Sequence, residues 1–311
     1  EKYLEKKTGK NYGPTGNKSL IYFIDDLNMP EVDKYGTTGA HTIIKQHMDY
    51  GHWYCRNKLT LKDIHNCQYL TSMNPKAGSF TVSQRVQRHF ATFTVIIPSE
   101  ESLFAIYKSI MTGHLTNPFN KFPANVQSLC SNFVTATVQL HDRCCQIFTP
   151  SANKFHYVFN MRDLSSVFTG VLFCTHEVLK VPRDLMRLWA HETERVYKDK
   201  LSDLNDVGTF NKTQNDCIRK NFEEMDDQIK LPLIFSHFAK GIGENKYAQI
   251  PEWDDLDRIL SDSLRGYNEM YAAMDLVLFE DAMMHICRIN RILESPNANA
   301  LLIGVGGSGK Q

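Results

Sequence analysis

The sequence predicts an α/β fold in which portions of a parallel sheet stand on either side of an all-helical domain. Residues 18–98 alternate strand-like apolar runs with helix-like segments, residues 99–225 carry helical spacing, and residues 301–303 form an apolar run before a glycine-rich loop. Strands that alternate with helices are typical of parallel sheets covered by helices. We therefore expect three domains, at 1–98, 99–225 and 226–311.

Composition and charge narrow the classes of partner. The 311 residues include 35 basic and 35 acidic side chains, so the net charge is zero and a broad electrostatic surface for nucleic acid or anionic lipid is not expected. The sequence holds no apolar run of the ~18 residues that a bilayer span needs. The eight cysteines show no framework spacing, which favours reduced thiols in the cytoplasm. We expect no nucleic-acid partner and no membrane partner.

The first domain is expected to alternate strands with helical segments, as in a parallel α/β sheet. Each strand-like run is four to eight residues long and is bounded by polar, Gly or Pro residues. The elements expected are a strand at 20–24 buried on both faces, a helix at 40–50, a hairpin at 53–61, a strand at 69–72 and a strand at 90–97.

After Pro98 the spacing of the apolar residues changes to the period of helices. Ser99 followed by two glutamates is an N-cap with acidic residues in the first turn, and Pro182 suits the first turn of another helix. We expect helices from residue 99 and at 125–148, 163–180 and 182–201, a polar break at 206–216, a long helical run at 253–293 interrupted near Gly266, and a final strand at 301–303.

The first stretch that indicates chemistry is IYFIDDLNMP, residues 21–30. A buried parallel strand delivers the residues at its carboxyl end to the crevice where α/β sheets bind ligands. There Asp25 would hold the Mg²⁺ shell, and Asp26 would orient or activate the attacking water. The alternative is a strand that ends in a solvated Asp-Asp turn.

A second stretch, TSMNP at 71–75, places Asn74 at the end of a strand one helix after the acidic strand. These motifs resemble those of AAA+ ATPases, in which an amide at this place senses the γ-phosphate. Arg85 and Arg88, in SQRVQRHF, precede the next expected strand, where an arginine finger would face a neighbouring module. The alternatives are an Asn-Pro turn and a solvated charged turn.

The most specific motif is GVGGSGK at 304–310, which fits the G-x-x-x-x-G-K phosphate-binding loop after a short strand. Backbone N–H groups of such a loop bind phosphate, and Lys310 supplies the cation. A glycine-rich loop that closes a hairpin is the alternative. The residues expected to bind the nucleotide are Gly304, Val305, Gly306, Gly307, Ser308, Gly309, Lys310 and Gln311.

The order of these motifs predicts two modules. Within one P-loop module the phosphate loop precedes the acidic strand, whereas here the acids at 25–26 come before the loop at 304–310. A single module would require a circular permutation. Two tandem modules require only that the chain be an excerpt of a longer polypeptide, and this is what we expect.

Six stretches carry a closer resemblance over essentially the whole chain. They are FIDDLNMPEVDKYGT, QHMDYGHWYCRNKLTLKDI, TSMNPKAGSFTVSQRVQRHF, FNMRDLSSVFTGVL, RLWAHETERVYKDKL and LLIGVGGSGKQ. In this order they resemble axonemal dynein heavy chains of the outer-arm beta type, from the Walker B strand of the third AAA+ module to the P-loop of the fourth.

The resemblance implies a six-module ring within one chain, with ATP or ADP and Mg²⁺ bound between modules. It implies that 99–225 is the lid of the third module, that Arg162 is its sensor 2, and that Arg85 or Arg88 acts on the second module's nucleotide. The implied partners are neighbouring modules and, through other parts of the parent chain, intermediate chains, light chains and microtubules in a cilium or flagellum.

Two positions depart from the family's pattern. AAA+ modules usually end the acidic strand with Asp-Glu, whereas this chain has Asp26, which is one methylene shorter. Gln311 stands where a Ser or Thr hydroxyl normally reaches Mg²⁺. Hydrolysis in the third module and Mg²⁺ handling in the fourth are therefore in question. A structural module that holds nucleotide without turnover, and a separate-subunit remodelling ATPase, stand as alternatives to a regulatory motor segment.

Overall fold

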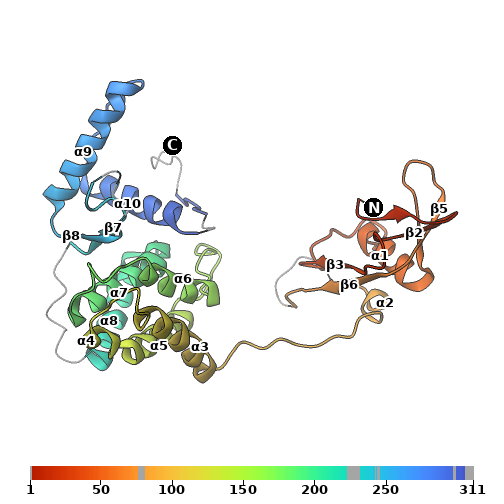
Figure 1. Ribbon diagram of the computed structural model, residues 1–311, viewed down its shortest axis with the longest axis horizontal. Helices are drawn as coiled ribbons and strands as arrows, with labels where there is room; N and C mark the ends of the chain where they lie inside the picture. The colour runs from red at the N-terminus through yellow and green to blue at the C-terminus, as the bar shows by residue number, and fades with distance from the viewer. Residues whose placement is uncertain are drawn as a thin grey trace. The chain divides into compact units, whose positions relative to one another are not determined.

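The structure is a computed structural model, and it describes residues 2–75, 81–222, 232–241, 243, 246–296 and 299–304. Its residues form two compact units, Glu1–Ile96 and Ile97–Gln311 (Figure 1).

The described residues of the first unit form two small sheets and two helices. Strands β1, β2, β5 and β4 form one sheet in that order, with β2 and β5 parallel and the outer pairs antiparallel. Strands β3 and β6 form a separate parallel pair. The elements are β1 (Glu5–Lys6), β2 (Asn11–Gly13), β3 (Leu20–Ile24), α1 (Gly39–Tyr50), β4 (His52–Tyr54), β5 (Leu61–Ile64), β6 (Cys67–Thr71) and α2 (Gln84–Gln87).

Most elements expected in this unit are confirmed. The expected strand at 20–24 is β3, the expected helix at 40–50 is α1, and the expected hairpin is the antiparallel pair β4–β5. Helix α1 ends at Gly51, whose φ of 72° lies in the left-handed region and whose N–H donates to the His47 carbonyl at 2.7 Å. Glycine adopts this terminating conformation without the steric cost of a Cβ.

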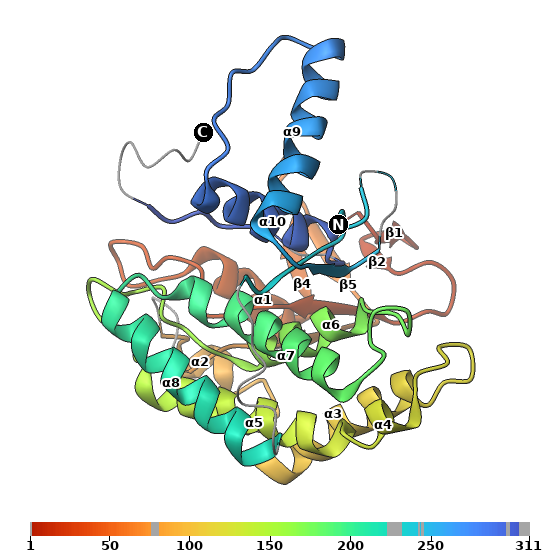
Figure 2. The ribbon, with the colours of Figure 1, turned by 90° about the vertical axis from the view of Figure 1, so that its left-hand side faces the viewer.

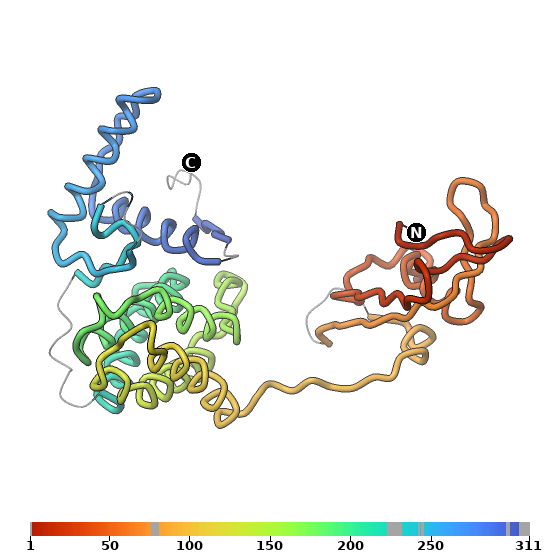
Figure 3. The backbone as a smooth tube through the Cα atoms, viewed as in Figure 1, coloured from red at the N-terminus to blue at the C-terminus, as the bar shows by residue number. Residues whose placement is uncertain are grey.

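Two expectations for the first unit are wrong. Strand β3 is not buried on both faces, because Ile21 and Phe23 are 59% and 63% exposed. The segment 90–97 forms no strand, and Figure 3 traces it as a single extended segment. A β-strand requires a neighbour to pair its N–H and C=O groups. Among the described residues no strand lies beside this segment, and its side chains from Ala91 to Ile97 remain exposed.

The second unit is mainly helical (Figure 2). Helices α3 to α8 surround a large core, and β7 and β8 pair antiparallel before two further helices. Its elements are α3 (Glu100–Leu115), α4 (Ala124–Gln127), α5 (Cys130–Ile147), α6 (Met161–Leu172), α7 (Pro182–Val196), the 3-10 helix η1 (Lys198–Lys200), α8 (Leu204–Asn221), β7 (Ile234–Ser236), β8 (Ala248–Ile250), α9 (Trp253–Met270) and α10 (Glu280–Glu294).

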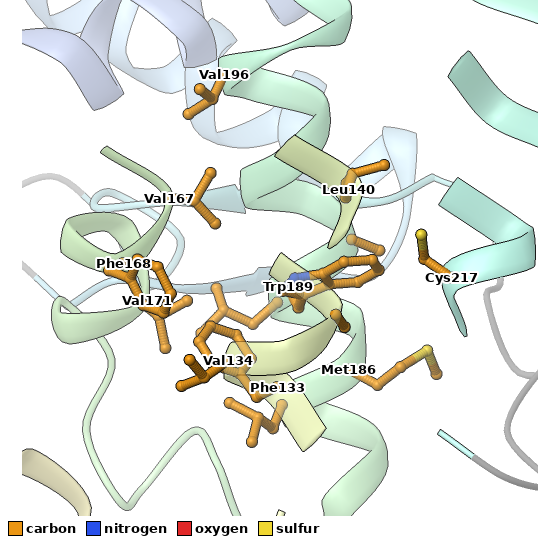
Figure 4. Close-up of a cluster of buried hydrophobic side chains, with 14 of the residues drawn as sticks. Phe133, Val134, Leu140, Val167, Phe168, Val171, Met186, Trp189, Val196 and Cys217 are labelled. Carbon is orange, nitrogen blue, oxygen red and sulfur yellow. The ribbon is translucent and has the colours of Figure 1, made fainter. Parts of the chain in front are cut away.

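Trp189 of α7 lies in the middle of the helical core. Figure 4 shows its ring among side chains of neighbouring helices, including Phe133 and Leu140 of α5 and Cys217 of α8, and all of these side chains are almost completely buried. The indole N–H donates to the Thr137 hydroxyl at 2.9 Å, so burial leaves no unpaired donor on the ring.

The expected break at 206–216 is wrong, because α8 runs through it. Asp203 caps the helix by accepting from the N–H of Asn205 at 3.0 Å. The polar stretch still buries one side of the helix, from Phe210 to Ile218. Buried Gln214 is satisfied because its amide donates to the Ala190 carbonyl at 3.0 Å and to the Thr193 hydroxyl at 2.8 Å.

Other helix boundaries also differ from the expected ones. The segment 125–148 is divided between α4 and α5, the helix expected at 163–180 ends at Leu172, and the one expected at 182–201 ends as η1. Helix α9 continues through Gly266, and the interruption falls at 271–279 instead. Residues 301–303 form no strand and are more than half exposed, since no described strand pairs with them. Among the described residues, no helix combines the length and apolar content needed to cross a bilayer.

Candidate functional site

The candidate site lies where strands β3 and β6 end. These strands are parallel and in register, with Ile24 opposite Thr71. Their carboxyl ends therefore meet at one edge of the sheet, and the residues that follow each strand become neighbours. Asp25 and Asp26 follow β3, and Ser72 follows β6.

Among the described residues, the carboxylate of Asp25 makes its contacts through one oxygen. Its Oδ1 accepts from the Ser72 hydroxyl at 2.6 Å and from the backbone N–H of Asp26 at 3.1 Å. Asp26 has φ of 50°, in the left-handed region that short polar residues such as Asp tolerate better than most. The turn exposes both aspartates at the edge of the sheet.

Backbone hydrogen bonds tie the acidic turn to the loop after β6. The Ser72 N–H donates to the Ile24 carbonyl at 3.0 Å, and the Leu27 N–H donates to the Ser72 carbonyl at 3.1 Å. The buried Asn28 amide donates to the Asn74 carbonyl at 3.1 Å. The acids and the expected sensor residue thus belong to one hydrogen-bonded arrangement.

Sequence reasoning missed three residues that hold this arrangement. They are Ser72, Asn28 and His41, whose ring nitrogen Nε2 lies 2.6 Å from the Leu27 carbonyl. The available signal was the polar Ser72, which precedes Asn74 by two residues. Its contact with Asp25 depends on the register of β3 against β6.

The two candidate finger arginines have different surroundings. Arg88 pairs with Asp49 at 3.1 Å, and Asp49 also contacts His89 at 3.0 Å and the Lys45 ammonium. The hydrogen bond from Lys45, opposed by desolvation and assisted by Arg88, lowers the pKa of Asp49. The Arg85 N–H donates to the Ser83 hydroxyl at 3.3 Å, but its guanidinium has no hydrogen-bond or ion-pair partner among the described residues.

Arg162 lies in the second compact unit, at the start of α6. Its N–H donates to the Asn160 side chain at 2.9 Å, and the Asn160 N–H donates to Asp163 at 3.0 Å, which completes a capping box. The Arg162 side chain is exposed, and its role as sensor 2 stays a prediction.

The expected phosphate loop lies almost entirely outside the described residues. Gly304 is described, whereas Val305, Gly306, Gly307, Ser308, Gly309, Lys310 and Gln311 lie outside them. The roles of these residues in nucleotide binding stay predictions.

Helix α10, which leads toward that loop, is fixed to the helical core by a buried ion pair. Oε2 of Glu192 on α7 accepts from the Arg291 Nε at 3.0 Å and from its terminal nitrogen Nη2, and Oε1 accepts from the Tyr247 hydroxyl. Burial disfavours the charge of Arg291, but the Glu192 carboxylate outweighs it and raises the pKa of Arg291. Burial, and next the Glu192 charge, raises the pKa of Tyr247.

This carboxylate has room only because position 170 on α6 is a glycine. A Cβ added at Gly170 would lie 1.7 Å from Oε2 of Glu192 and 2.8 Å from Nη2 of Arg291. A second contact, from Arg288 of α10 to Asp199 of η1 at 3.2 Å, also joins α10 to the helical domain. Desolvation raises the pKa of Asp199, and the nearby arginines oppose that rise.

The donor set at the sheet edge fits Mg²⁺. Oδ2 of Asp25 has no partner among the described residues, and carboxylate and amide oxygens are ligands that Mg²⁺ accepts. The described residues contain no group of three His, Cys, Asp or Glu side chains able to hold a metal by themselves. Mg²⁺ that is bound through one or two carboxylates and substrate phosphates does not need such a group.

Family models match three parts of the chain. A model described as "P-loop containing dynein motor region" matches residues 1–98, an "AAA+ lid domain" matches 133–232, and "P-loop containing dynein motor region D4" matches 274–311. The α/β class with a helical lid is therefore confirmed.

Curated relatives match along the whole chain. Human dynein axonemal heavy chain 17 is 56% identical over 313 residues, the ciliary dynein beta chain of Tripneustes gratilla is 55% identical over 313, and the flagellar outer-arm dynein alpha chain of Chlamydomonas reinhardtii is 46% identical over 318. Each match covers 100% of this chain and 7% of the relative. The chain belongs to the dynein heavy chain family, and these relatives are axonemal, ciliary and flagellar.

Proposed function

We propose that this chain is a nucleotide-binding, regulatory part of the AAA+ ring of an axonemal dynein. The observation that carries the proposal is the joint position of Asp25, Ser72 and Asn74 at the carboxyl ends of two parallel strands. Ligands bind at this edge in α/β sheets. The segment would supply the acids and sensors of the third module and the phosphate loop of the fourth.

The roles follow from the chemistry of each side chain. Asp25 would hold Mg²⁺ through Oδ2, Asp26 would orient a water, and Asn74 would donate to the γ-phosphate. Bound Mg²⁺ would neutralise charge on the phosphates of ATP or ADP.

We assign the finger to Arg85, because Arg88 is already paired with Asp49 within the same unit. An arginine finger must leave its guanidinium available to phosphate on the adjacent module. Arg162 would reach the phosphates of the third module from the lid.

The wider role is inferred from the relatives. Nucleotide in the third and fourth modules would set the geometry of the ring and so regulate ATP-driven, minus-end-directed movement on microtubules and the beating of the cilium. Neighbouring modules would be the direct partners. Intermediate chains, light chains and the microtubule would bind to other parts of the parent chain. The parent chain would be located in the cytoplasm and in the axoneme of a cilium or flagellum.

A second candidate function is a structural module that keeps its nucleotide without turnover. The left-handed backbone of Asp26 favours it, because Asp suits φ of 50° for conformational reasons alone. Under this alternative the short acid reflects the turn and has no part in hydrolysis.

Substitutions at the acidic turn test the proposal. In a full-length heavy chain whose first module is inactivated at its own P-loop, Asp25→Asn should reduce Mg²⁺-dependent nucleotide retention, whereas the exposed control Glu31→Gln should not. Equal retention by the two variants would overturn the assignment of Asp25.

The same background separates regulation from a structural role. Asp26→Glu should raise phosphate release by about tenfold or more if the short acid limits hydrolysis, since positioned general bases contribute ~10²–10⁴-fold. An unchanged rate combined with very slow nucleotide exchange would support the structural module instead.

A third comparison tests the choice of arginine. Arg85→Ala should shorten nucleotide retention in the second module, while Arg88→Ala should leave it unchanged. The reverse result would move the finger to Arg88.

A further inference from the structure

We infer that Ser72 is a positioning residue for Asp25, and that its hydroxyl determines how strongly this edge of the sheet holds the Mg²⁺ of the nucleotide. The inference rests on the proposed function, and it assigns a role to a residue outside the acidic and sensor positions themselves.

The backbone fixes Ser72 on both sides. Its N–H donates to the carbonyl of Ile24 at 3.0 Å, and its carbonyl accepts from the N–H of Leu27 at 3.1 Å. Ile24 and Leu27 flank the two aspartates. The Cα of Ser72 is therefore held opposite the acidic turn, and its short side chain has little freedom to leave Asp25.

The hydroxyl then selects one oxygen of the carboxylate. Ser72 Oγ donates to Oδ1 at 2.6 Å, a length typical of hydroxyl bonds to ionised carboxylates. The Asp26 N–H donates to the same oxygen at 3.1 Å. With two donors on Oδ1, rotation of the carboxylate is restricted and Oδ2 is the oxygen presented to a cation.

A second link keeps the two loops at a fixed separation. Asn28 is only 7% exposed, and its amide donates to the Asn74 carbonyl at 3.1 Å. The acidic turn and the sensor loop are thus joined at Ser72 and again at Asn74. Because Asp25 and Ser72 are exposed at the edge, side-chain packing contributes little to the orientation of the carboxylate.

Hydrogen-bond partners that orient a metal ligand typically change metal affinity by 10–100-fold when they are removed. Since Asp25 is exposed and retains its bond from the Asp26 N–H, we expect an effect at the lower end of this range. Ser72→Ala should raise the Mg²⁺ concentration for half-maximal nucleotide retention by about tenfold. Ser72→Thr, which keeps the hydroxyl, should restore a value near that of the unaltered chain.

The experiment uses the full-length heavy chain with its first module inactivated, and it measures retention of a fluorescent ATP analogue against Mg²⁺ concentration. The part of the signal that Asp25→Asn removes is assigned to the third module. Ser19→Ala is the matched control, because Ser19 is an exposed serine just before the opposite end of β3. Retention in EDTA reports binding that does not depend on the metal.

The role of Ser72 is supported if Ser72→Ala shifts only the Mg²⁺ dependence and has no further effect in the Asp25→Asn background. The role is overturned if Ser72→Ala has the same Mg²⁺ dependence of nucleotide retention as the unaltered chain. It is also overturned if Ser72→Ala lowers retention in EDTA as much as it lowers retention in Mg²⁺, as a general loss of structure would. If the unaltered chain shows no Mg²⁺-dependent retention that depends on Asp25, the proposed function fails, and the role of Ser72 fails with it.

Discussion

The helical core of the second unit and the sheet edge of the first unit hold charged groups in opposite ways. In the core, Glu192 is 0% exposed and its carboxylate is saturated by Arg291 and Tyr247. At the sheet edge, Asp25 is exposed and uses one oxygen, while β3 leaves Ile21 and Phe23 exposed beside it. The proposed nucleotide site therefore lies at a sheet edge with little side-chain packing, and hydrogen bonds between the two loops hold its residues in place there.

The difference follows from the cost of desolvation. A buried charge is tolerated only when partners satisfy it, so removing one partner leaves the other charge uncompensated in a low-dielectric interior. An exposed charge keeps its hydration, so the loss of one partner changes its orientation more than the stability of the fold. The predictions below test this contrast, from the largest expected effect on stability to the smallest.

The largest effect is expected from Glu192→Ala. The substitution leaves the Arg291 guanidinium buried without its carboxylate, and breaking a buried pair in this way costs about 3–5 kcal/mol. Urea denaturation of the 311-residue chain, followed by circular dichroism, measures the change. Glu177→Ala removes the exposed pair with Lys246 and should leave the midpoint unchanged. Similar shifts of the urea midpoint for both variants would contradict the contrast between buried and exposed ion pairs.

A smaller loss is expected from Gly170→Ala. The new Cβ would lie 1.7 Å from Oε2 of Glu192, so the carboxylate or the helix must move. Overpacking of this kind costs about 1–3 kcal/mol. Gly208→Ala is the control, because nothing lies within 4 Å of a Cβ added there and the substitution should stabilise α8 by up to ~1 kcal/mol. Opposite signs for the two variants are the result that supports the tight fit at Gly170.

Mild acid should destabilise the helical core through His191. Its Nδ1 lies 3.0 Å from the Leu233 carbonyl, so that nitrogen donates and Nε2 carries no proton. Complete burial, and next the charge of Arg195, lowers the pKa of His191 well below its ordinary value.

Below the ordinary histidine pKa of about 6.5, the unfolded chain binds a proton that the folded chain does not, so stability falls as pH falls. The slope is at most about 1.4 kcal/mol per pH unit for each such histidine. Denaturation midpoints between pH 7.5 and 5.5 measure it, and His191→Asn should flatten the dependence. An identical slope in that variant would assign the effect to the other histidines of the second unit whose pKa values burial also lowers, which are His114, His141 and His237.

The smallest effect is expected from Arg88→Ala at the first unit. The Arg88 side chain is 61% exposed, and Asp49 keeps Lys45 and His89 when Arg88 is removed. Exposed ion pairs contribute little to stability. The denaturation midpoint of the 311-residue chain should therefore not change, and a clear loss would show that this edge depends on its charges for folding.

Local chemistry accounts for the parts of the fold that the sequence predicts well. Ser99 accepts from the N–H of Ser102 at 3.3 Å and begins α3, and Pro182 begins α7, as the capping rules require. The acids at 25–26 do follow a strand. These features depend on residues within one turn or one strand of each other.

The missed features depend on residues far apart in the chain. Ser72 meets Asp25 across 47 residues, and Arg291 meets Glu192 across 99. These contacts are set by the register of a parallel strand pair and by the packing of one helix on another. The local sequence pattern predicts neither of the two. The polar stretch at 206–216 is helical for the same reason, because the partners that satisfy buried Gln214 lie on α7.

The segments 90–97 and 301–303 are predicted to be strands but form none, for a different reason. Apolar, β-branched composition indicates that a segment is able to form a strand, but a strand also needs a neighbour for its backbone groups. Composition alone does not report whether that neighbour lies within the same 311 residues.

The fit between Gly170 and Glu192 has a consequence for how related chains vary. The carboxylate occupies the space in which a methyl group on α6 would lie, so positions 170 and 192 cannot be chosen independently. A chain with a side chain at 170 would need a shorter residue at 192, and an arginine at 291 would then have no carboxylate to pair with. Aligned dynein chains should therefore show these three positions changing as a set, with the glycine, the acid and the arginine either kept together or replaced together.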